Sequence, residues 1–256
     1  SEVVKIALIL WTADKLARKG VKLRSLARGS ASILLVTGIL GLLVAVHDLG
    51  TAVAIVLVAG IMLFSAGVPM LHLMGMVLGA LGGMVVMVWR APYRWERIAS
   101  FRNPWLDPQD TGYHLIQSLY AIGSGGLWGR GLGKSLQKEF FLPDPHNDFI
   151  FSVLAEELGF LGAFAVIALF LLVAWRGIRA ALRAPDTFSA LLACGVTAMV
   201  VTQAAINIAV VTGSIPVTGI TLPLVSYGGS SLLITMVSLG ILINITRYTD
   251  TGEVKR

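Results

Sequence analysis

The sequence is poor in charge and has almost no cysteine. Only 13% of its 256 residues are charged, against roughly 25% in a soluble domain. The single cysteine, Cys194, excludes an internal disulfide bond, and no Cys/His spacing of the zinc-binding type occurs. The sequence also has no fixed-period repeat and no low-complexity tract. These absences argue against a soluble domain, a zinc module and a repeat protein.

Apolar sequence is abundant instead, with 56% hydrophobic residues and a mean hydropathy of +0.81. About 20 consecutive apolar residues cross a bilayer as a helix. Seven runs fit such spans, the first being the weakest because it is short and contains Glu2 and Lys5. They lie at about 2–17, 31–47, 51–68, 70–89, 148–175, 187–212 and 222–246. We therefore predict an all-α, polytopic transmembrane helix bundle, with residues 1–256 forming a single membrane domain.

Basic residues gather in three places, at 15–28, 176–183 and 247–256. Basic loops stay in the cytoplasm, so the net charge of +6 indicates membrane orientation rather than nucleic-acid binding. Seven alternating spans place all three clusters and the C-terminus in the cytoplasm, and residues 90–147 in an extracytoplasmic loop. The first span then starts outside, and the chain begins with Ser1 rather than Met. Both features suggest that the chain is a C-terminal part, and an odd number of preceding helices would explain the first.

The predicted extracytoplasmic loop mixes arginines with tryptophans, which is typical of a membrane interface. Residues 113–122 have helical apolar periodicity and suggest an amphipathic or re-entrant helix. The glycine-rich stretch 123–135, GSGGLWGRGLGKS, has two interpretations. Its backbone N–H groups would suit a phosphate, or its glycines would serve a flexible loop or close packing against a neighbour.

Asp148 stands where a proline-broken segment meets the fifth apolar run. Pro143 and Pro145 disfavour helix, so we expect a helix to begin at about Asn147 or Asp148. Asp148 is then either a helix N-cap or a carboxylate at the end of a membrane helix, suited to act as a general base on a sugar hydroxyl. Asp48, in HDLGTA, is expected to cap the next helix.

Two carboxylates, Glu156 and Glu157, follow within the same apolar run. On a helix Glu156 lies about 80° around from Asp148 and roughly 12 Å further along, whereas Glu157 lies about 180° around. Only Glu156 can share a face with Asp148. Intramembrane carboxylates either face a functional cavity or join a hydrogen-bonded network between helices, and both alternatives stay open. Asn207 and Gln203, one turn apart, suggest an interhelical hydrogen-bond pair.

Basic residues just upstream of Asp148 suit either a diphosphate or an interfacial anchor; they are Arg130, Lys134 and Lys138. His146 would suit a metal ligand or a base, although a lone loop histidine is more often neither. The YGGSS stretch at 227–231 favours close helix packing.

Several longer motifs, in this order and spacing, resemble the SEDS family of peptidoglycan polymerases, which comprises FtsW, RodA and SpoVE. They are DLGTA at 48–52, FRNPW at 101–105, GLWGRGLGKS at 126–135, LPDPHNDFIF at 142–151 and TLPLVSYGGSS at 221–231. The resemblance covers essentially the whole chain and is greatest to the FtsW group. Three positions depart from the family pattern: His47 replaces a proline, Asp144 a glutamate and Asn147 a threonine.

The resemblance implies the last seven helices of a ten-helix enzyme that joins lipid II units into glycan strands and releases undecaprenyl diphosphate. Asp148 falls on the family's essential acidic residue and would deprotonate the acceptor hydroxyl. Lys138, Arg94, Arg130 or a divalent cation such as Mg²⁺ or Mn²⁺ would stabilise the diphosphate. The other expected substrate contacts are Gln117, Ser118, Glu156, His146 and Ser230. No metal site built from protein ligands is predicted.

The resemblance also implies a place in the bacterial inner membrane, with lipid II as substrate and a class B penicillin-binding protein, a transpeptidase, as partner. Further partners would be membrane proteins of the division or elongation machinery, and no nucleic acid is expected. The alternatives are a transporter that flips lipid II, a non-catalytic scaffold, and the elongation or sporulation member of the family.

Overall fold

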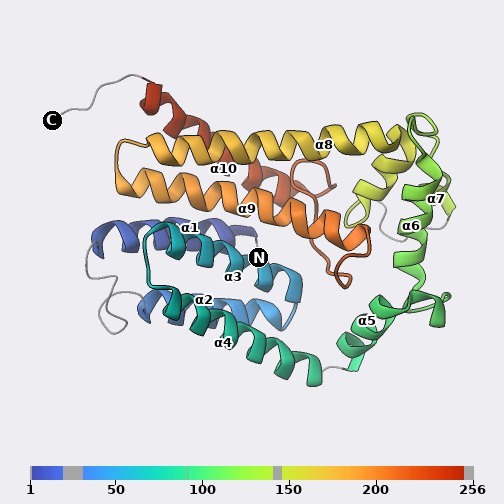
Figure 1. Cartoon of the computed structure of the whole chain (residues 1–256), viewed down its shortest axis with the longest axis horizontal. Helices are drawn as coiled ribbons and strands as arrows, with labels where there is room; N and C mark the ends of the chain where they lie inside the picture. Colours follow the sequence, from blue (N-terminus) through green and yellow to red (C-terminus); the bar gives the residue numbers. More distant parts are fainter. Residues whose placement is uncertain (1, 20–30, 91, 141–145, 251–256) are drawn as a thin grey trace. The chain divides into compact units, whose positions relative to one another are not determined.

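The computed structural model describes residues 2–19, 31–90, 92–140 and 146–250, which are mainly helical and contain no strand. The helices are α1 Glu2–Lys19, α2 Ala31–Ala45, α3 Leu49–Ser65, α4 Met70–Trp89, α5 Pro92–Arg102, the 3₁₀ turn η3 Pro104–Leu106, α6 Tyr113–Gly125, α7 Leu136–Phe140, α8 Ile150–Arg183, α9 Thr187–Val211 and α10 Gly229–Asp250 (Figure 1). The predicted all-α class is confirmed.

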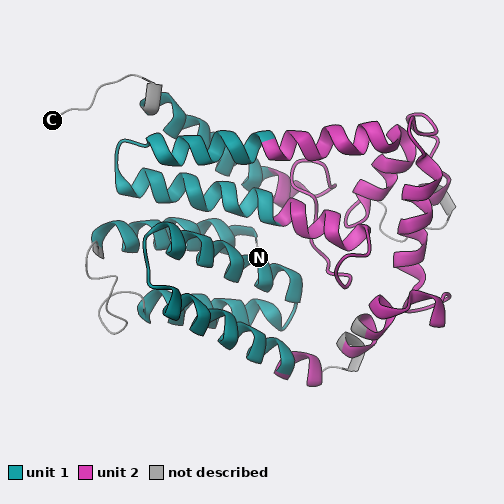
Figure 2. Ribbon diagram, in the orientation of Figure 1, with its two compact units in different colours: residues 1–85, 172–202, 233–256 teal, residues 86–171, 203–232 magenta. Residues whose placement is uncertain are grey.

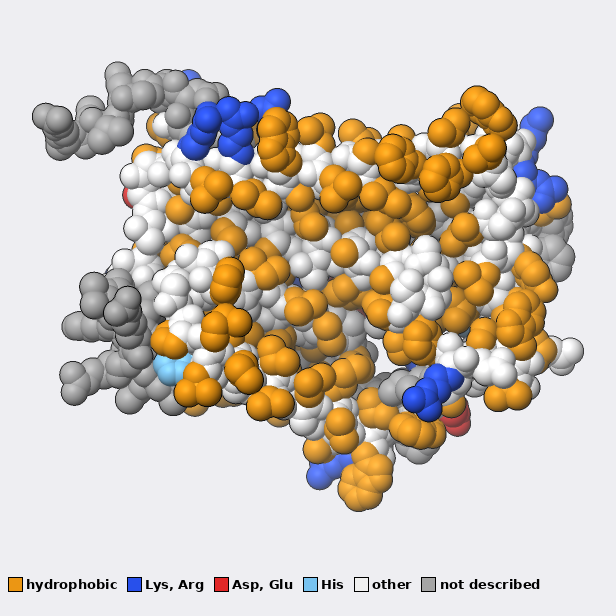
Figure 3. All heavy atoms as spheres, viewed as in Figure 1, with side chains coloured by type: hydrophobic (Ala, Val, Ile, Leu, Met, Phe, Trp, Pro, Cys, Tyr) orange, Lys and Arg blue, Asp and Glu red, His pale blue; other side chains and the backbone are white. Residues whose placement is uncertain are grey.

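Each of the seven predicted spans corresponds to a helix. In the described part of the chain, α4, α8, α9 and α10 are long and apolar enough to cross a membrane, with mean hydropathies of 1.7 to 2.5, while α2 and α3 are shorter apolar helices. The chain is a multi-pass membrane protein. Large hydrophobic side chains such as Leu71 and Phe160 are exposed, as suits contact with lipid, and Figure 3 shows many of them (orange) on one face.

Two predicted boundaries were wrong by several residues. The fifth helix begins at Ile150, not at 147–148, because residues 146–149 form turns. The last helix begins at Gly229, not at 222, because a turn after Pro223 interrupts the apolar run. Both segments that were assigned to membrane helices are therefore irregular backbone, and both belong to the candidate site described below.

The chain divides into two compact units, which are coloured separately in Figure 2. Unit 1 contains residues 1–85, 172–202 and 233–256, and unit 2 contains residues 86–171 and 203–232. Because α8, α9 and α10 each contribute to both units, a unit is not a contiguous stretch of sequence.

Small residues allow close helix packing within unit 1. A Cβ atom on Gly195 of α9 would lie 2.7 Å from Ile9 of α1 and from Met62 of α3, so only glycine permits this approach. Asp48 caps α3 as predicted, since its carboxylate accepts a hydrogen bond from the Thr51 backbone N–H at 3.0 Å. Asp186 accepts equivalent bonds from Ser189 before α9, and they lower the pKa of its carboxyl.

Unit 2 has its core around the start of α8. The buried hydrophobic residues there are Phe149, Phe151, Val153, Ala204, Val211 and Leu222. They come from the start of α8, the end of α9 and the 212–228 segment, so three stretches that are distant in sequence meet where Asp148 lies. Burial of the two phenylalanines, each 3% exposed, fixes the chain immediately after Asp148.

Helix α8 is broken at Gly159, whose φ of 68° and ψ of −169° lie outside the helical region. The glycine-rich segment fills the break. Phe160 N–H donates to Gly126 O at 2.8 Å, and Arg130 N–H donates to Glu156 O at 3.0 Å. A Cβ atom on Gly159 would lie 2.3 Å from Gly129 N. These glycines thus serve close packing against a neighbour, one of the two interpretations of this stretch, and Arg130 N–H is not available to a phosphate.

Candidate functional site

Asp148 is half-buried in the turn immediately before α8. Its backbone carbonyl accepts a hydrogen bond from Asn207 Nδ2 of α9 at 2.8 Å, and the same amide nitrogen donates to Ile220 O at 2.8 Å. Asn207 is 1% exposed. It therefore binds two main-chain carbonyls from segments outside α9.

The two carbonyls that precede Asp148 are held by the segment before α10. Ser226 Oγ donates to Asn147 O at 2.6 Å, and Tyr227 N–H donates to His146 O at 2.8 Å. Three consecutive carbonyls, those of residues 146–148, are thus hydrogen-bonded by groups from elsewhere in unit 2. We call Asn207, Ser226 and Tyr227 the carbonyl clamp. The clamp fixes the backbone from which the Asp148 carboxylate projects.

One neighbour of the Asp148 carboxylate is a glycine, Gly219, which has no side chain. A Cβ atom added to Gly219 would lie 3.6 Å from Asp148 Oδ2, which is ordinary van der Waals distance, so this oxygen lies directly beside the backbone of the 212–228 segment. At the next residue, the Phe149 ring stacks on His114 of α6 with centroids 5.9 Å apart. Neighbours from α6, α9 and the 212–228 segment therefore orient Asp148.

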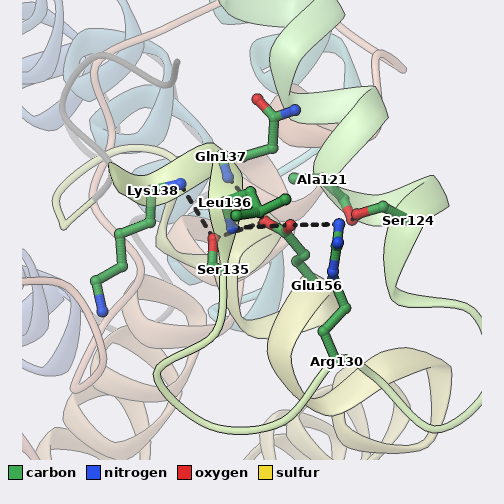
Figure 4. Close-up of polar contacts among 8 residues, drawn as sticks. All are labelled: Ala121, Ser124, Arg130, Ser135, Leu136, Gln137, Lys138 and Glu156. Atoms are coloured by element: carbon green, nitrogen blue, oxygen red, sulfur yellow. Dashed lines mark hydrogen bonds and ion pairs between the residues drawn. The ribbon is translucent and has the colours of Figure 1, made fainter. Parts of the chain in front are cut away.

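Glu156 lies at the centre of a second polar cluster, shown in Figure 4. It is fully buried, and its carboxylate accepts hydrogen bonds from Ser135 Oγ at 2.6 Å and from the backbone N–H groups of Leu136 and Gln137 at 3.2 and 3.4 Å. Arg130 NH1 lies 3.5 Å from Glu156 Oε1. The carboxylate thus stabilises the start of α7 and the segment before it. This placement corresponds to the structural network considered above and does not support a direct substrate contact.

Glu157 pairs with Lys138 of α7, at 3.7 Å between Oε1 and Nζ. The Lys138 side chain is 31% exposed and that of Arg130 40% exposed. Adjacent carboxylates of α8 therefore hold two basic residues that were predicted to contact the diphosphate. Both basic groups remain partly open to solvent.

The remaining residues that were predicted to contact substrate differ in their exposure to solvent. Ser118 is fully buried, donates to Val211 O at 2.7 Å and lies 2.6 Å from Ser152 Oγ, so its predicted contact with substrate is not supported by this placement. Gln117 is half-buried, while His146 and Ser230 are exposed. Arg94 belongs to α5, but its side chain lies outside the described residues, as do Pro143, Asp144 and Pro145.

Ser226 was not selected from the sequence, although it lies within TLPLVSYGGSS. The only sequence feature that could have indicated Ser226 is a polar residue in an otherwise apolar stretch. Such residues are common in loops, so the feature is not specific. Only the fold shows which backbone group the hydroxyl binds.

Within the described ranges, no three His, Cys, Asp or Glu side chains come together as a metal centre.

Comparison with known proteins identifies the family. Residues 1–251 match the cell cycle protein family named after FtsW, RodA and SpoVE. The chain belongs to this family. Its relatives include the stage V sporulation protein E of Bacillus subtilis, 47% identical over 250 residues that make up 97% of this chain and 68% of that protein. A probable peptidoglycan glycosyltransferase FtsW from Geobacter is 44% identical over 96% of this chain and 67% of the relative.

Solved structures of this family have the same fold. A peptidoglycan synthase complex, described as coordinating polymerization and crosslinking, contains a chain that matches with a TM-score of 0.77 and 31% identity, covering 98% of this chain and 70% of that one. The rod shape determining protein RodA of Thermus thermophilus matches with a TM-score of 0.64 and 29% identity, covering 97% and 65%. The chain thus spans about two thirds of the length of its relatives. These findings confirm the predicted family and the membrane helix bundle.

Proposed function

We propose that this protein is a peptidoglycan glycosyltransferase that polymerises lipid II, with Asp148 as the general base. The observation that carries the proposal is the Asp148 carboxylate, which is half-buried before a long apolar helix on a backbone fixed by the carbonyl clamp. A general base must lie within about 2.6–3.2 Å of the proton that it removes, and a fixed backbone provides that positioning. The named FtsW relative supports the same activity.

In the proposed reaction Asp148 removes the proton from the 4-hydroxyl of the acceptor N-acetylglucosamine. The oxygen forms a bond to the anomeric carbon of the lipid-linked N-acetylmuramic acid, with inversion. The bond from that carbon to the diphosphate oxygen breaks, and its electron pair leaves with undecaprenyl diphosphate. The proton stays on the Asp148 carboxyl until it is released to solvent.

The leaving diphosphate gains negative charge, so positive groups aimed at it lower the barrier. Lys138 and Arg130 are suitable because each is partly exposed and each is held by a carboxylate of α8. These ion pairs restrict the two side chains without consuming all of their N–H donors, of which arginine has five and lysine three. Arg94 is proposed for the same role by resemblance alone. A divalent cation, if used, would be held mainly by the diphosphate, as is common for Mg²⁺.

We further propose that residues 90–147 and the start of α8 face the outside of the bacterial inner membrane, with the C-terminus in the cytoplasm. Basic residues at 176–183 support this orientation. The similarity to a chain of a synthase complex supports a penicillin-binding protein as partner. A class B transpeptidase is the expected kind, since it would crosslink the strands that this chain polymerises.

The test is a polymerisation assay on the full-length protein, reconstituted in vesicles with labelled lipid II. Asp148→Asn keeps the size and backbone of the residue but removes the base, so glycan formation should fall by at least about 10²-fold, the lower range for general-base catalysis. The thermal midpoint should stay unchanged. Glycan formation by Asp148→Asn at the wild-type rate would refute the role of Asp148.

The same vesicles test the transporter function, and a complementation experiment in cells tests the scaffold function. A transporter would move labelled lipid II across the bilayer without forming polymer, and a scaffold would support growth of cells that carry only the Asp148→Asn variant. Either result would contradict the proposal, because it requires polymer from the wild-type protein and at least about 10²-fold less from the variant.

A further inference from the structure

The turn that carries Ser226 contains a strained residue. Leu224 has a φ of 67° and is the one non-glycine residue with positive φ in the described ranges. Val225 N–H donates to Leu222 O at 3.2 Å, which closes a β-turn with Pro223 and Leu224 at its two central positions. When the second central residue has positive φ, glycine or asparagine is the usual choice. A leucine there costs conformational free energy.

The leucine side chain does not explain this strain. It is 45% exposed, so burial of the side chain is only partial and does not alone account for the conformation. The backbone hydrogen bonds do hold it, since Ser226 N–H also donates to Leu222 O, at 3.0 Å. Backbone strain that persists under such constraint is often found at functional sites.

Ser226 connects this turn to the residue before Asp148. Its Oγ accepts a hydrogen bond from Leu222 N–H at 2.7 Å and donates to Asn147 O at 2.6 Å. One hydroxyl therefore acts as acceptor toward the turn and as donor toward the candidate catalytic segment. Neither alanine nor cysteine replaces both functions well, whereas threonine carries the same hydroxyl.

We propose that the strained turn at 222–226 is a positioning device for Asp148, and that Ser226 is its positioning residue. The inference rests on the proposed function, because it assumes that Asp148 is the general base. Leu224 in its left-handed conformation aligns the Leu222 N–H and O groups with Ser226. Ser226 then sets the Asn147 carbonyl, and with it the direction of the next residue, Asp148. Asn207 and Tyr227 hold the carbonyls on either side.

If Ser226 positions Asp148, loss of its hydroxyl should change the rate of the reaction rather than the binding of substrate. A misplacement of about 1 Å can reduce a rate by about 10²-fold even when the substrate still binds. Loss of the Ser226 hydroxyl should therefore lower kcat and leave the KM for lipid II nearly unchanged.

The first test compares serine variants of the full-length protein in the lipid II polymerisation assay. Ser226→Ala should lower kcat by about 10- to 100-fold, and Ser226→Thr should restore most of it. The matched control is Ser214→Ala, because Ser214 lies in the same 212–228 segment but its hydroxyl lies 3.1 Å from Thr212 Oγ1, not beside the 146–148 carbonyls. Wild-type kcat in Ser226→Ala, or an equal loss in Ser226→Thr and Ser226→Ala, would overturn the inference.

The second test separates backbone conformation from side-chain chemistry at Leu224. Leu224→Gly adopts positive φ without strain and should retain polymerisation. Leu224→Val should lose it, because a β-branched residue tolerates positive φ poorly. Full activity in Leu224→Val would overturn the role of the strained turn, and so would inactivity in Leu224→Gly.

A double variant distinguishes failure of this inference from failure of the proposed function. If Asp148 is the base and Ser226 acts through it, Ser226→Ala should have no further effect in an Asp148→Asn background. An active Asp148→Asn enzyme refutes the proposed base. An inactive Asp148→Asn enzyme together with a fully active Ser226→Ala enzyme refutes only the positioning role.

Discussion

At the scale of single residues, two adjacent glutamates have different surroundings. Glu156 is fully buried and accepts hydrogen bonds from Ser135, Leu136 and Gln137, whereas Glu157 keeps a 3.7 Å ion pair with the partly exposed Lys138. Helical geometry predicted that they face different ways. It did not predict the partners of either, because these lie at residues 135–138, at the start of α7, and the geometry of α8 does not specify where α7 packs.

This difference gives a prediction for stability. Glu156→Ala leaves buried donors of the 135–137 segment unpaired and should lower the free energy of unfolding by about 1–3 kcal/mol. Glu157→Ala, the matched control, should cost less than about 1 kcal/mol, because its ion pair is long and its partner is solvated. Thermal unfolding in detergent measures both. Equal losses would contradict the assignment of Glu156 as the anchor of α7.

At the scale of elements, α8 was predicted as a helix, but its break at Gly159 was not. An apolar run of this length predicts a helix from sequence alone. Gly159 sits inside that run without any local sign that it breaks the helix, since glycines also occur in continuous membrane helices. The break arises because Gly126 and Leu127 carbonyls replace the helical partners of Phe160 and Leu161 N–H.

Because of this break, adding a single methyl group at Gly159 should strongly lower the stability of the protein. Gly159→Ala should destabilise the protein by at least about 1–3 kcal/mol, since alanine at positive φ is strained and its Cβ would lie 2.3 Å from Gly129 N. Gly240→Ala in α10 is the control, because its Cβ would meet nothing within 4 Å. That substitution should be neutral or stabilising. Hydrogen exchange at 126–131 should rise only in Gly159→Ala, and unchanged exchange there would argue against the pairing.

At the scale of the whole molecule, charge and hydropathy patterns determine which segments leave the membrane. Seven apolar runs became seven helices, and the long polar interval became α5, η3, α6 and α7. The proposed orientation across the bilayer rests on the basic clusters and the positive-inside tendency.

Cysteine labelling tests this orientation. Cys194 is the only cysteine in the 256-residue sequence, so Cys194→Ser, together with replacement of any cysteine elsewhere in the full-length protein, gives a cysteine-free background. In it, Gln109→Cys should react with a membrane-impermeant thiol reagent in spheroplasts, and Asp186→Cys only after permeabilisation. Both positions are exposed, so accessibility reports the side of the membrane. The reverse pattern would invert the proposed topology.

The sequence by itself determined the membrane class, the seven helices and the cap at Asp48, because these depend on apolar run length and local capping. Asp148 was selected as the candidate base by its contiguous motif, and that role stays a prediction. The tertiary structure alone decided what surrounds Asp148. The carbonyl clamp joins residues that are 59 to 81 positions apart in the chain (148 to 207, and 146 to 227). Hydrogen bonds between such distant groups have no local sequence signal, since they form only when α8, α9 and the segment before α10 pack around a common core.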